Sequence, residues 1–381
     1  MKKEKDNPKV LYVGRYNSDE ILTGPEKVAK RIFHLKAKFD KTTFVEYFFD
    51  GKQYSYFIKL FGKTNVGVIN YSPILRLGII RLLFFVFNYK PDIIHIITFE
   101  RFAALLFIFK LFKKIRYIYN VHGVIIHENV HFRDVKWFQK IKDYVAEKIF
   151  LRFSNDVFVL SDTCKELIKK YYKLENNKFN NIDNGIDLEF HEASSMRKYK
   201  TNNSLKLVFI ADIVRKEKGF YFFKSTLEEI NFPIDLYIVD KKDTIDNFEF
   251  INKKINVYSY DKMCPSELAE FFKDKDVFVS SSFYEPYSIS AVEAMASGLV
   301  PIFTYETGAS KHIIDEINGY ILDFGDKEKL KSILMSLIEN HESIKKISSE
   351  ARKIYNQFSW IKVYGDYEKI YKQELKNNTS I

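Results

Sequence analysis

Two carboxylates with seven residues between them, Glu285 and Glu293, are the side chains of this chain best placed to do chemistry. Residues 277–280 form a short β-branched and aromatic run that predicts a buried strand, and residues 288–297 carry small apolar residues at helical spacing. The loop between them therefore leaves the carboxyl end of a strand, where parallel α/β sheets bind ligands. Carboxylates at that edge can accept hydrogen bonds from hydroxyl groups of a ligand.

The start of this predicted helix offers a second kind of group, the backbone N–H groups near Ile289 and Ser290. Free N–H groups and the positive end of the helix dipole favour a phosphate. The structural alternative is that Ser290 and Glu293 form a capping box, with Glu285 as an ordinary exposed acid. Spacing alone leaves both interpretations open.

Arg215 and Lys218 precede another predicted helix, over residues 220–230, where basic residues oppose the helix dipole. A bound diphosphate would explain their position, because Arg215 offers a two-pronged donor and Lys218 a point charge. A solvated basic turn is the alternative.

The residues around the two glutamates resemble a known family. The run Glu285-Pro286-Tyr287-Ser288, followed by Glu293-Ala294-Met295-Ala296, Gly298 and Pro301, is similar to the E-x7-E signature of the retaining GT-B glycosyltransferases of family 4, also called group 1. The resemblance implies two Rossmann-like, doubly wound α/β domains that face each other across a cleft. It implies that Glu285 holds hydroxyls of the donor sugar and that Glu293 holds the ribose. The leaving diphosphate would be stabilised by Arg215, Lys218 and the N–H groups near Ile289 and Ser290.

Two positions in the first half gain meaning from the same resemblance. Gly24 lies in Thr23-Gly24-Pro25 before a predicted helix, where the family has a glycine close to the donor and acceptor sugars. His122 ends a predicted strand, where the family has a histidine beside the transferred sugar. By residue pattern alone, a turn glycine and a hydrogen-bonded strand-end histidine explain both positions.

The chain departs from the family pattern in two places. Ala211-Asp212 stands where the family has Gly-Arg, and the arginine of this chain, Arg215, comes three residues further on. His312 stands where the family has a glutamate.

Two metal motifs fail on their context. Residues 127–131, HENVH, match the H-E-x-x-H pattern of zinc peptidases, but they follow a strand and a glycine, and no convincing third ligand follows. We predict a mobile loop over the acceptor there. Asp274 and Asp276 are similar to a metal-binding D-x-D, but a helix-to-strand turn explains both acids. We therefore expect no metal and no cofactor, with a UDP-sugar as the expected substrate.

Charge is unevenly distributed along the 381 residues. The net charge is +10, and the first 190 residues hold 33 Lys and Arg against 21 Asp and Glu, so the whole excess lies in the first half. Residues 74–87 and 102–112 are apolar and basic, and too short and charged to span a membrane. They can rest on an anionic bilayer or form core helices with basic edges. No motif supports binding of nucleic acid.

The two cysteines, Cys164 and Cys264, have no disulfide or metal spacing, and no secretory signal is visible. We therefore expect a cytoplasmic protein, peripheral at the inner face of the plasma membrane if the basic segments contact it.

Alternating strands and helices predict the domain organisation. We expect an acceptor-binding domain over residues 1–190, a polar linker over 191–204, a nucleotide-sugar domain over 205–360, and a helix over 361–381 that returns to the first domain. Within the first domain, a helix is predicted over residues 73–89.

The sequence thus predicts a retaining, metal-independent hexosyltransferase that uses a nucleotide sugar and a glycan or lipid-linked acceptor in cell-surface polysaccharide or glycoconjugate synthesis. The alternatives are a GT-B nucleotide-sugar epimerase, which shares the nucleotide site, an H-E-x-x-H zinc peptidase, and a protein that binds nucleotide or membrane without catalysis.

Overall fold

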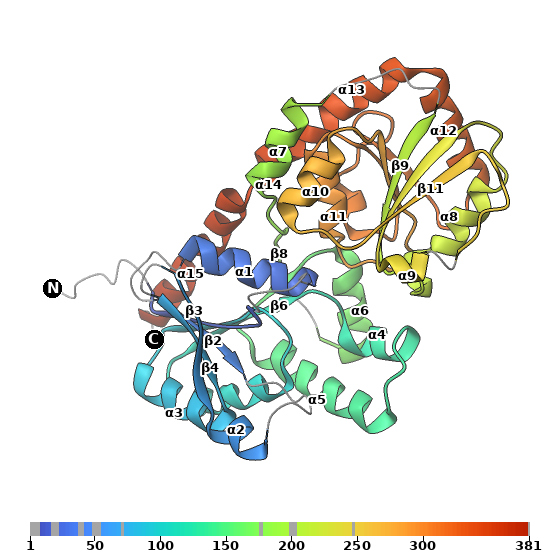
Figure 1. Ribbon diagram of the computed structural model, residues 1–381. Coiled ribbons are helices and arrows are strands. Elements are labelled where there is room, and N and C mark those ends of the chain that lie inside the picture. Colours follow the sequence, from blue (N-terminus) through green and yellow to red (C-terminus); the bar gives the residue numbers. More distant parts are fainter. Residues whose placement is uncertain are drawn as a thin grey trace. The chain divides into compact units, whose positions relative to one another are not determined.

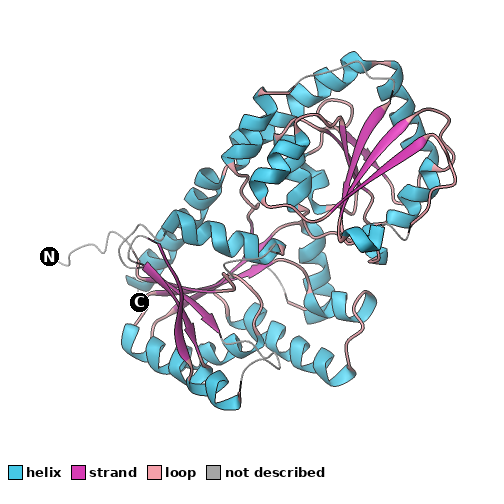
Figure 2. Ribbon diagram, viewed as in Figure 1, coloured by secondary structure: helices cyan, strands magenta, loops and turns pink. Residues whose placement is uncertain are grey.

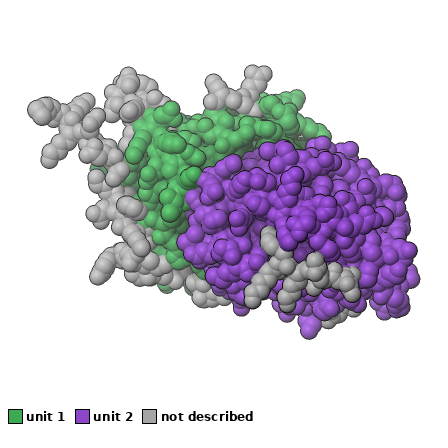
Figure 3. Space-filling view, turned by 90° about the horizontal axis from the view of Figure 1, so that it is seen from above, with its two compact units in different colours: residues 1–183, 361–381 green, residues 184–360 purple. Residues whose placement is uncertain are grey.

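The computed structural model describes residues 8–16, 23–36, 42–47, 55–69, 72–174, 178–197, 204–245 and 248–379. The chain divides into two compact units, unit 1 (residues 1–183 with 361–381) and unit 2 (residues 184–360) (Figure 3). In each unit a sheet lies among helices (Figure 2). Each unit is described by itself below.

The polar stretch 191–204 predicts a linker, but its first part belongs to helix α7 (Leu188–Ser195) of unit 2. Phe190 and Ala193 on this helix are buried, and the Phe190 ring lies 6.2 Å from that of Phe272. These two apolar residues anchor the helix even though its neighbours are polar. Residues 198–203 of the predicted linker lie outside the described residues.

The sheet of unit 1 has the strand order β3, β4, β2, β1, β5, β6, β7, β8, and it is parallel except for the β3–β4 pair. Its strands are β1 (Val10–Val13), β2 (Thr42–Tyr47), β3 (Lys63–Ile69), β4 (Ser72–Leu77), β5 (Ile93–Ile96), β6 (Arg116–Val121), β7 (Asp156–Val159) and β8 (Phe179–Asn181).

The helix predicted over residues 73–89 is wrong in its first part. Residues 72–77 form β4, and the helix α3 (Ile79–Tyr89) begins only after Gly78. A Cβ atom on Gly78 would lie 2.5 Å from the backbone of Leu60, so glycine is required where the strand ends. The apolar residues that resemble one helical face are therefore shared between a strand and a helix.

Helices cover both faces of this sheet (Figure 1). On one face lie α1 (Gly24–Lys36) and the C-terminal α15 (Trp360–Thr379), where the Phe33 ring lies 4.8 Å from that of Phe44. The other face packs a large apolar core against α3, η1 (Arg101–Leu111, a 3₁₀ helix), α5 (Trp137–Phe153) and α6 (Asp162–Tyr172). The short helices α2 (Tyr56–Phe61) and α4 (Ile125–His131) complete unit 1. None of the helices in the described ranges has the length and apolar character needed to cross a bilayer.

The sheet of unit 2 is wholly parallel, with the order β11, β10, β9, β12, β13, β14. This is the order 3-2-1-4-5-6 of a doubly wound nucleotide-binding fold. Its strands are β9 (Leu205–Ile210), β10 (Ile234–Val239), β11 (Ile255–Tyr260), β12 (Val277–Ser280), β13 (Val300–Thr304) and β14 (Tyr320–Leu322).

Helices connect these strands and pack over the sheet (Figure 1). They are η2 (Lys216–Lys218), α8 (Phe220–Leu227), α9 (Lys242–Ile245), α10 (Pro265–Phe272), α11 (Ile289–Ala296), η3 (Gly308–His312), α12 (Lys327–Glu339), α13 (His341–Ala351), η4 (Arg352–Ile354) and α14 (Tyr355–Phe358). The strand, loop and helix predicted around Glu285 and Glu293 are present as β12 and α11.

Candidate functional site

Unit 2 has a topological switch point between β9 and β12, because the strands that follow β9 lie on one side of it and the strands from β12 on lie on the other. Doubly wound sheets bind ligands outside the carboxyl ends of the strands at such a point. The loop after β9 carries Arg215 and Lys218, and the loop after β12 carries Glu285. The fold therefore brings together the residues that the sequence singles out in two separate segments.

Backbone contacts fix these two loops to each other. Gly219, between η2 and α8, has a φ of 69°, and a Cβ atom there would lie 1.8 Å from the carbonyl oxygen of Ser281. The Ser281 hydroxyl donates to the Gly219 carbonyl at 3.1 Å, and the Phe283 N–H donates to the Glu217 carbonyl at 3.0 Å. A side chain at residue 219 would separate the loops, so glycine is needed for both its φ and its size.

An ion pair joins the two loops at their exposed side. Lys218 Nζ donates to Glu285 Oε2 at 2.5 Å, and the two side chains are 15% and 18% exposed. The Glu285 N–H donates to the Glu306 carbonyl, and its carbonyl accepts from the Gly308 N–H at 2.8 Å. The Glu285 backbone is thus held on both sides, while its carboxylate and the Lys218 ammonium remain within reach of a ligand.

Arg215 lies in the same loop but binds inside it. Its Nε donates to Glu217 Oε1 at 2.6 Å, and the Glu217 side chain is only 2% exposed. The Arg215 side chain is 38% exposed, so part of the guanidinium faces solvent. The arginine is held at the site by Glu217 and retains donors for a diphosphate.

Helix α11 begins at Ile289, and Ser288 before it has a left-handed φ of 72°. Ser290 is therefore the second residue of the helix and not its cap, which excludes the capping box with Glu293. Glu293, on the fifth residue of the helix, is 3% exposed. The N–H groups of Ile289 and Ser290 lie in the first turn, as the functional interpretation requires.

The two acids of the D-x-D run have structural roles in unit 2. Asp276 Oδ2 accepts from the Lys206 N–H at 3.0 Å, and Asp274 pairs with Lys206 and with Lys275. His312, which replaces the glutamate of the family pattern, packs its ring 4.5 Å from that of Phe358. Among the described residues, the structure shows no contact of the two acids or of His312 with the Lys218–Glu285 pair.

His122 directly follows β6 in unit 1, which ends at Val121, and it is half-buried. Its Nε2 lies 2.8 Å from the Ile97 carbonyl, so Nε2 carries the proton and donates. Burial lowers the pKa of His122 to about 4, although the Ile97 carbonyl opposes this shift. The imidazole is therefore neutral at pH 7.

Gly24 is the first residue of α1, before Pro25, so the predicted loop-to-helix turn is present.

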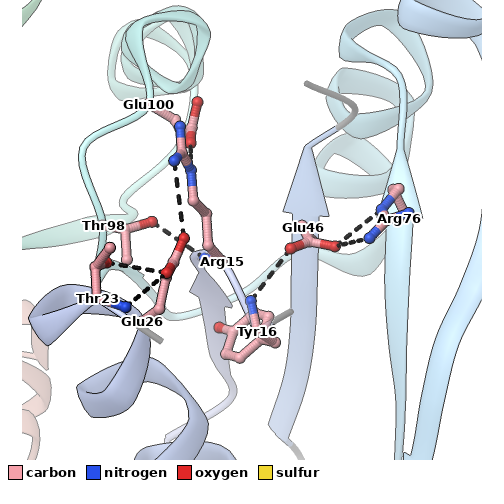
Figure 4. Close-up of polar contacts among 8 residues, drawn as sticks. All are labelled: Arg15, Tyr16, Thr23, Glu26, Glu46, Arg76, Thr98 and Glu100. Atoms are coloured by element: carbon pink, nitrogen blue, oxygen red, sulfur yellow. Dashed lines mark hydrogen bonds and ion pairs between the residues drawn. The ribbon is translucent and has the colours of Figure 1, made fainter. Parts of the chain in front are cut away.

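Unit 1 has its own switch point, between β1 and β5, and a polar cluster fills it (Figure 4). The Arg15 guanidinium pairs with Glu100 through Nε and lies 3.8 Å from Glu26. The Arg15 N–H donates to the Thr98 hydroxyl at 3.1 Å. Glu26 also accepts from the N–H and the hydroxyl of Thr23, at 3.0 and 2.9 Å.

A second pair lies on the neighbouring strands. Glu46 on β2 is fully buried, accepts from Arg76 Nε on β4 at 2.9 Å and accepts from the Tyr16 N–H at 3.2 Å (Figure 4). Sequence reasoning missed both pairs. The signal available for Arg15, Thr98 and Glu100 was their position just after two predicted buried strands. That signal needs the strand order, which the sequence did not provide.

The H-E-x-x-H residues form the helix α4 and not the predicted loop. The helix begins where buried Glu147 accepts the N–H groups of Ile125 and Ile126, a cap supplied from a distant helix. His127 Nδ1 and His131 Nε2 each lie within 3.1 Å of the Tyr171 hydroxyl. In the described part of the chain no group of three or more His, Cys, Asp or Glu is arranged to hold a metal ion.

Comparison with known families assigns both halves of the chain. Residues 47–190 match the family described as Glycosyltransferase Family 4, and residues 193–354 match Glycosyl transferases group 1. The chain belongs to the group 1, or family 4, glycosyltransferases. This group 1 glycosyltransferase is therefore an enzyme, and its two α/β units form a GT-B fold.

Individual relatives of this glycosyltransferase are distant. The capsular polysaccharide biosynthesis glycosyltransferase CapM of Staphylococcus aureus is 23% identical over 279 residues, which cover 68% of this chain and 71% of that protein. The sucrose-phosphate synthase of Thermosynechococcus elongatus has a TM-score of 0.73 at 12% identity, over 97% of this chain and all of that one. Anabaena HepE in complex with UDP-glucose has a TM-score of 0.69 at 15% identity, over 98% of this chain and all of that one. These structures share the fold.

Proposed function

We propose that this glycosyltransferase is a retaining, metal-independent hexosyltransferase that moves a sugar from a UDP-sugar to a glycan or lipid-linked acceptor. The observation that carries the proposal is the Lys218–Glu285 pair, which lies at the switch point of unit 2, with Glu285 in the loop that precedes α11. It combines a cation for a diphosphate with a carboxylate for sugar hydroxyls. Metal independence is supported by the cations Lys218 and Arg215, which can take the place of a metal at the diphosphate.

In this mechanism the donor exchanges the internal ion pair for its own contacts. Lys218, Arg215 and the N–H groups of Ile289 and Ser290 bind the diphosphate. Glu285, released from Lys218, accepts from hydroxyls of the sugar, and Glu293 accepts from the ribose.

The bond from the anomeric carbon to the β-phosphate oxygen breaks, and the acceptor oxygen forms a new bond to the same face of that carbon. The acceptor proton passes to the leaving diphosphate. Fixed donors stabilise the charge that develops on the diphosphate, and this lowers the barrier.

Unit 1 is proposed to hold the acceptor. His122 is the catalytic residue that unit 1 contributes, beside the transferred sugar, and Gly24 allows a close approach of backbone to donor. A neutral imidazole suits a hydrogen bond to an uncharged sugar hydroxyl. The Arg15, Glu26 and Glu100 side chains at the same end of the sheet supply the polar groups that bind acceptor hydroxyls.

Relatives support the biological setting. CapM is named for capsular polysaccharide biosynthesis, and HepE binds UDP-glucose. We therefore propose a role in cell-surface polysaccharide or glycoconjugate synthesis, with UDP-glucose as the first donor to test. The proposed location is the cytoplasm, with peripheral contact between unit 1 and an anionic inner membrane face.

The proposal is tested first by nucleotide binding in EDTA. Thermal unfolding is followed with UDP, GDP, ADP and dTDP and with their sugars, for the wild type, Lys218→Ala and the control Lys216→Ala, which changes an exposed lysine of the same loop. A ligand at a hundredfold excess over its Kd stabilises the folded state by about 2.7 kcal/mol. We expect UDP or a UDP-sugar to raise the unfolding temperature of the wild type and of the control Lys216→Ala, but not that of Lys218→Ala.

Stereochemistry and product identity distinguish the remaining alternatives. Transfer with retention gives a product whose anomeric configuration, followed by NMR, equals that of the donor sugar. A nucleotide-sugar epimerase would release a free epimerised sugar without any acceptor. Inversion of configuration, or loss of all transfer in EDTA, would contradict the proposed mechanism.

A further inference from the structure

Helix η1 of unit 1 is apolar on two sides. A 3₁₀ helix has three residues per turn, so residues three apart form straight rows. One row is buried in the core, and it consists of Ala103, Leu106 and Phe109. The next row is exposed by 37 to 78%, and it consists of Phe102, Leu105, Ile108 and Leu111. The core takes this first row together with Phe107 of the third row, and it leaves the second row exposed to contact something else.

Helix α5 lies beside η1 and extends this surface. Arg101 Nε at the start of η1 lies 3.3 Å from Asp143 in the middle of α5, and Lys110 Nζ near the end of η1 donates to the Phe153 carbonyl at the end of α5 at 2.7 Å. The two helices therefore run side by side in the same direction. Helix α5 adds Phe138 and Ile141, exposed by 44 and 52%. We name the exposed row of η1 with Phe138 and Ile141 the outer face.

Basic residues dominate the exposed charge on the two helices of the outer face. Helix η1 has no carboxylate, and the two on α5, Asp143 and Glu147, are buried. Lys113, Lys142 and Lys148 lie on or next to these helices. At the end of the face, burial together with Lys110 and Arg152 lowers the pKa of Lys178 to about 8. Lys110 and Arg152 thus add to the effect of burial on Lys178, while Asp156 opposes it, and an anionic surface nearby would favour the charged lysine.

We infer that the outer face docks on an anionic lipid bilayer, with its apolar row at the acyl boundary and its lysines among the headgroups. An apolar stripe flanked by basic residues is the pattern of proteins that lie in the membrane interface. A symmetric contact with a second copy would bring two basic faces together, so the charge disfavours that occupant. The inference rests on the proposed function, because a lipid-linked acceptor would give this contact its purpose.

The test is co-flotation of the full-length protein with vesicles of phosphatidylcholine alone and of phosphatidylcholine with phosphatidylglycerol, at low and high salt. The variant Leu105→Ser with Ile108→Ser removes two apolar side chains of the outer face. The matched control is Ile314→Ser with Ile317→Ser, two residues of unit 2 with similar exposures of 59 and 51%. We expect the wild type and the control to bind anionic vesicles. We expect the outer-face variant to bind them at least about tenfold more weakly.

Equal binding of the wild type to neutral and anionic vesicles, or no effect of the outer-face variant, would overturn the inference. The inference would also be overturned if the wild type sediments as a dimer, the outer-face variant sediments as a monomer, and neither binds vesicles. A cooperative thermal unfolding transition close to that of the wild type checks that the variant is folded. If no nucleotide shifts the wild type but anionic vesicles still bind through the outer face, the proposed function fails and the docking surface stands.

Discussion

Lys218 Nζ and Glu285 Oε2 form an ion pair of 2.5 Å between two loops that the backbone has already fixed to each other. Each side chain is less than a fifth exposed, so each charge has lost part of its hydration and depends on the other. The two groups proposed to bind the donor therefore neutralise each other in the structure. A donor that carries both phosphate and hydroxyl groups can satisfy both at once.

The two members of this pair are expected to respond differently to substitution. Lys218→Ala removes a charged donor to the diphosphate, worth about 1.5–3 kcal/mol, and should weaken UDP binding about 10- to 100-fold. Glu285→Ala frees Lys218 and should leave UDP binding unchanged or tighter, while the extra affinity for UDP-glucose over UDP is lost. Titration calorimetry with both ligands measures this, with Lys216→Ala as control. Equal losses of UDP affinity in both variants would contradict the assigned roles.

Gly219 predicts a second measurable effect, on stability. Gly219→Ala adds a Cβ atom 1.8 Å from the Ser281 carbonyl at a residue with φ 69°, whereas Gly325→Ala, at φ 93°, meets nothing within 4 Å. The control therefore contains the cost of the positive φ, about 1 kcal/mol, without the collision. We expect Gly219→Ala to lower the free energy of unfolding of unit 2 in urea by about 1–3 kcal/mol more than Gly325→Ala. Equal losses would mean that the loops are free to separate.

Local patterns were sufficient to predict much of unit 2. The strand of residues 277–280, the loop with Glu285 and the helix after it have the predicted order, because a buried run, a polar turn and small apolar residues at helical spacing occur without interruption. Residues 72–89 were predicted less well. Their apolar residues fit one helix, but a strand ends at Gly78, which packs against the backbone of Leu60, in an earlier segment of the chain.

The site shows the same division. Lys218 and Glu285 were found from their own segments, and their contact follows from a strand order that matches a known fold. The Arg15–Glu100 pair was missed, because it depends on β1 and β5 being neighbours although 79 residues separate the end of one from the start of the other. Helix α4 was missed because its cap, Glu147, comes from another helix.

Glu147 combines this capping role with a perturbed acidity. It is fully buried, accepts from the N–H groups of Ile125 and Ile126, and pairs closely with the Tyr172 hydroxyl. Burial raises the pKa of Glu147 to about 7, and nearby Glu128 raises it further, whereas the three hydrogen bonds oppose the rise. The folded protein thus binds the Glu147 proton more tightly than the unfolded chain does.

This difference predicts how stability depends on pH. Because the folded-state pKa is raised from 4.5 to about 7, the contribution of Glu147 to stability is present below about pH 4.5 and is lost as pH rises through 7. The loss is on the order of 3 kcal/mol. Urea unfolding of unit 1 at several pH values should show this slope in the wild type and in the control Glu166→Gln, an exposed acid of α6. Glu147→Gln should be flatter by about that amount, and an identical slope in that variant would assign the titration to another group.

The last prediction concerns the C-terminal helix α15, which is held to unit 1 through buried His95. Asn120 Oδ1 lies 2.7 Å from Nε2 of His95 and can only accept, so Nε2 carries the proton and Nδ1 accepts from the Tyr371 hydroxyl at 2.6 Å. Tyr371→Phe keeps the ring but leaves Nδ1 without its donor in the core. We expect a loss of about 1–3 kcal/mol in the free energy of unfolding of unit 1, against no change for the exposed neighbour Lys372→Ala. If Tyr371→Phe is as stable as the wild type, the His95 network does not hold the helix, and the ring packing of residue 371 with Tyr12 and of Tyr367 with Phe158 must do so.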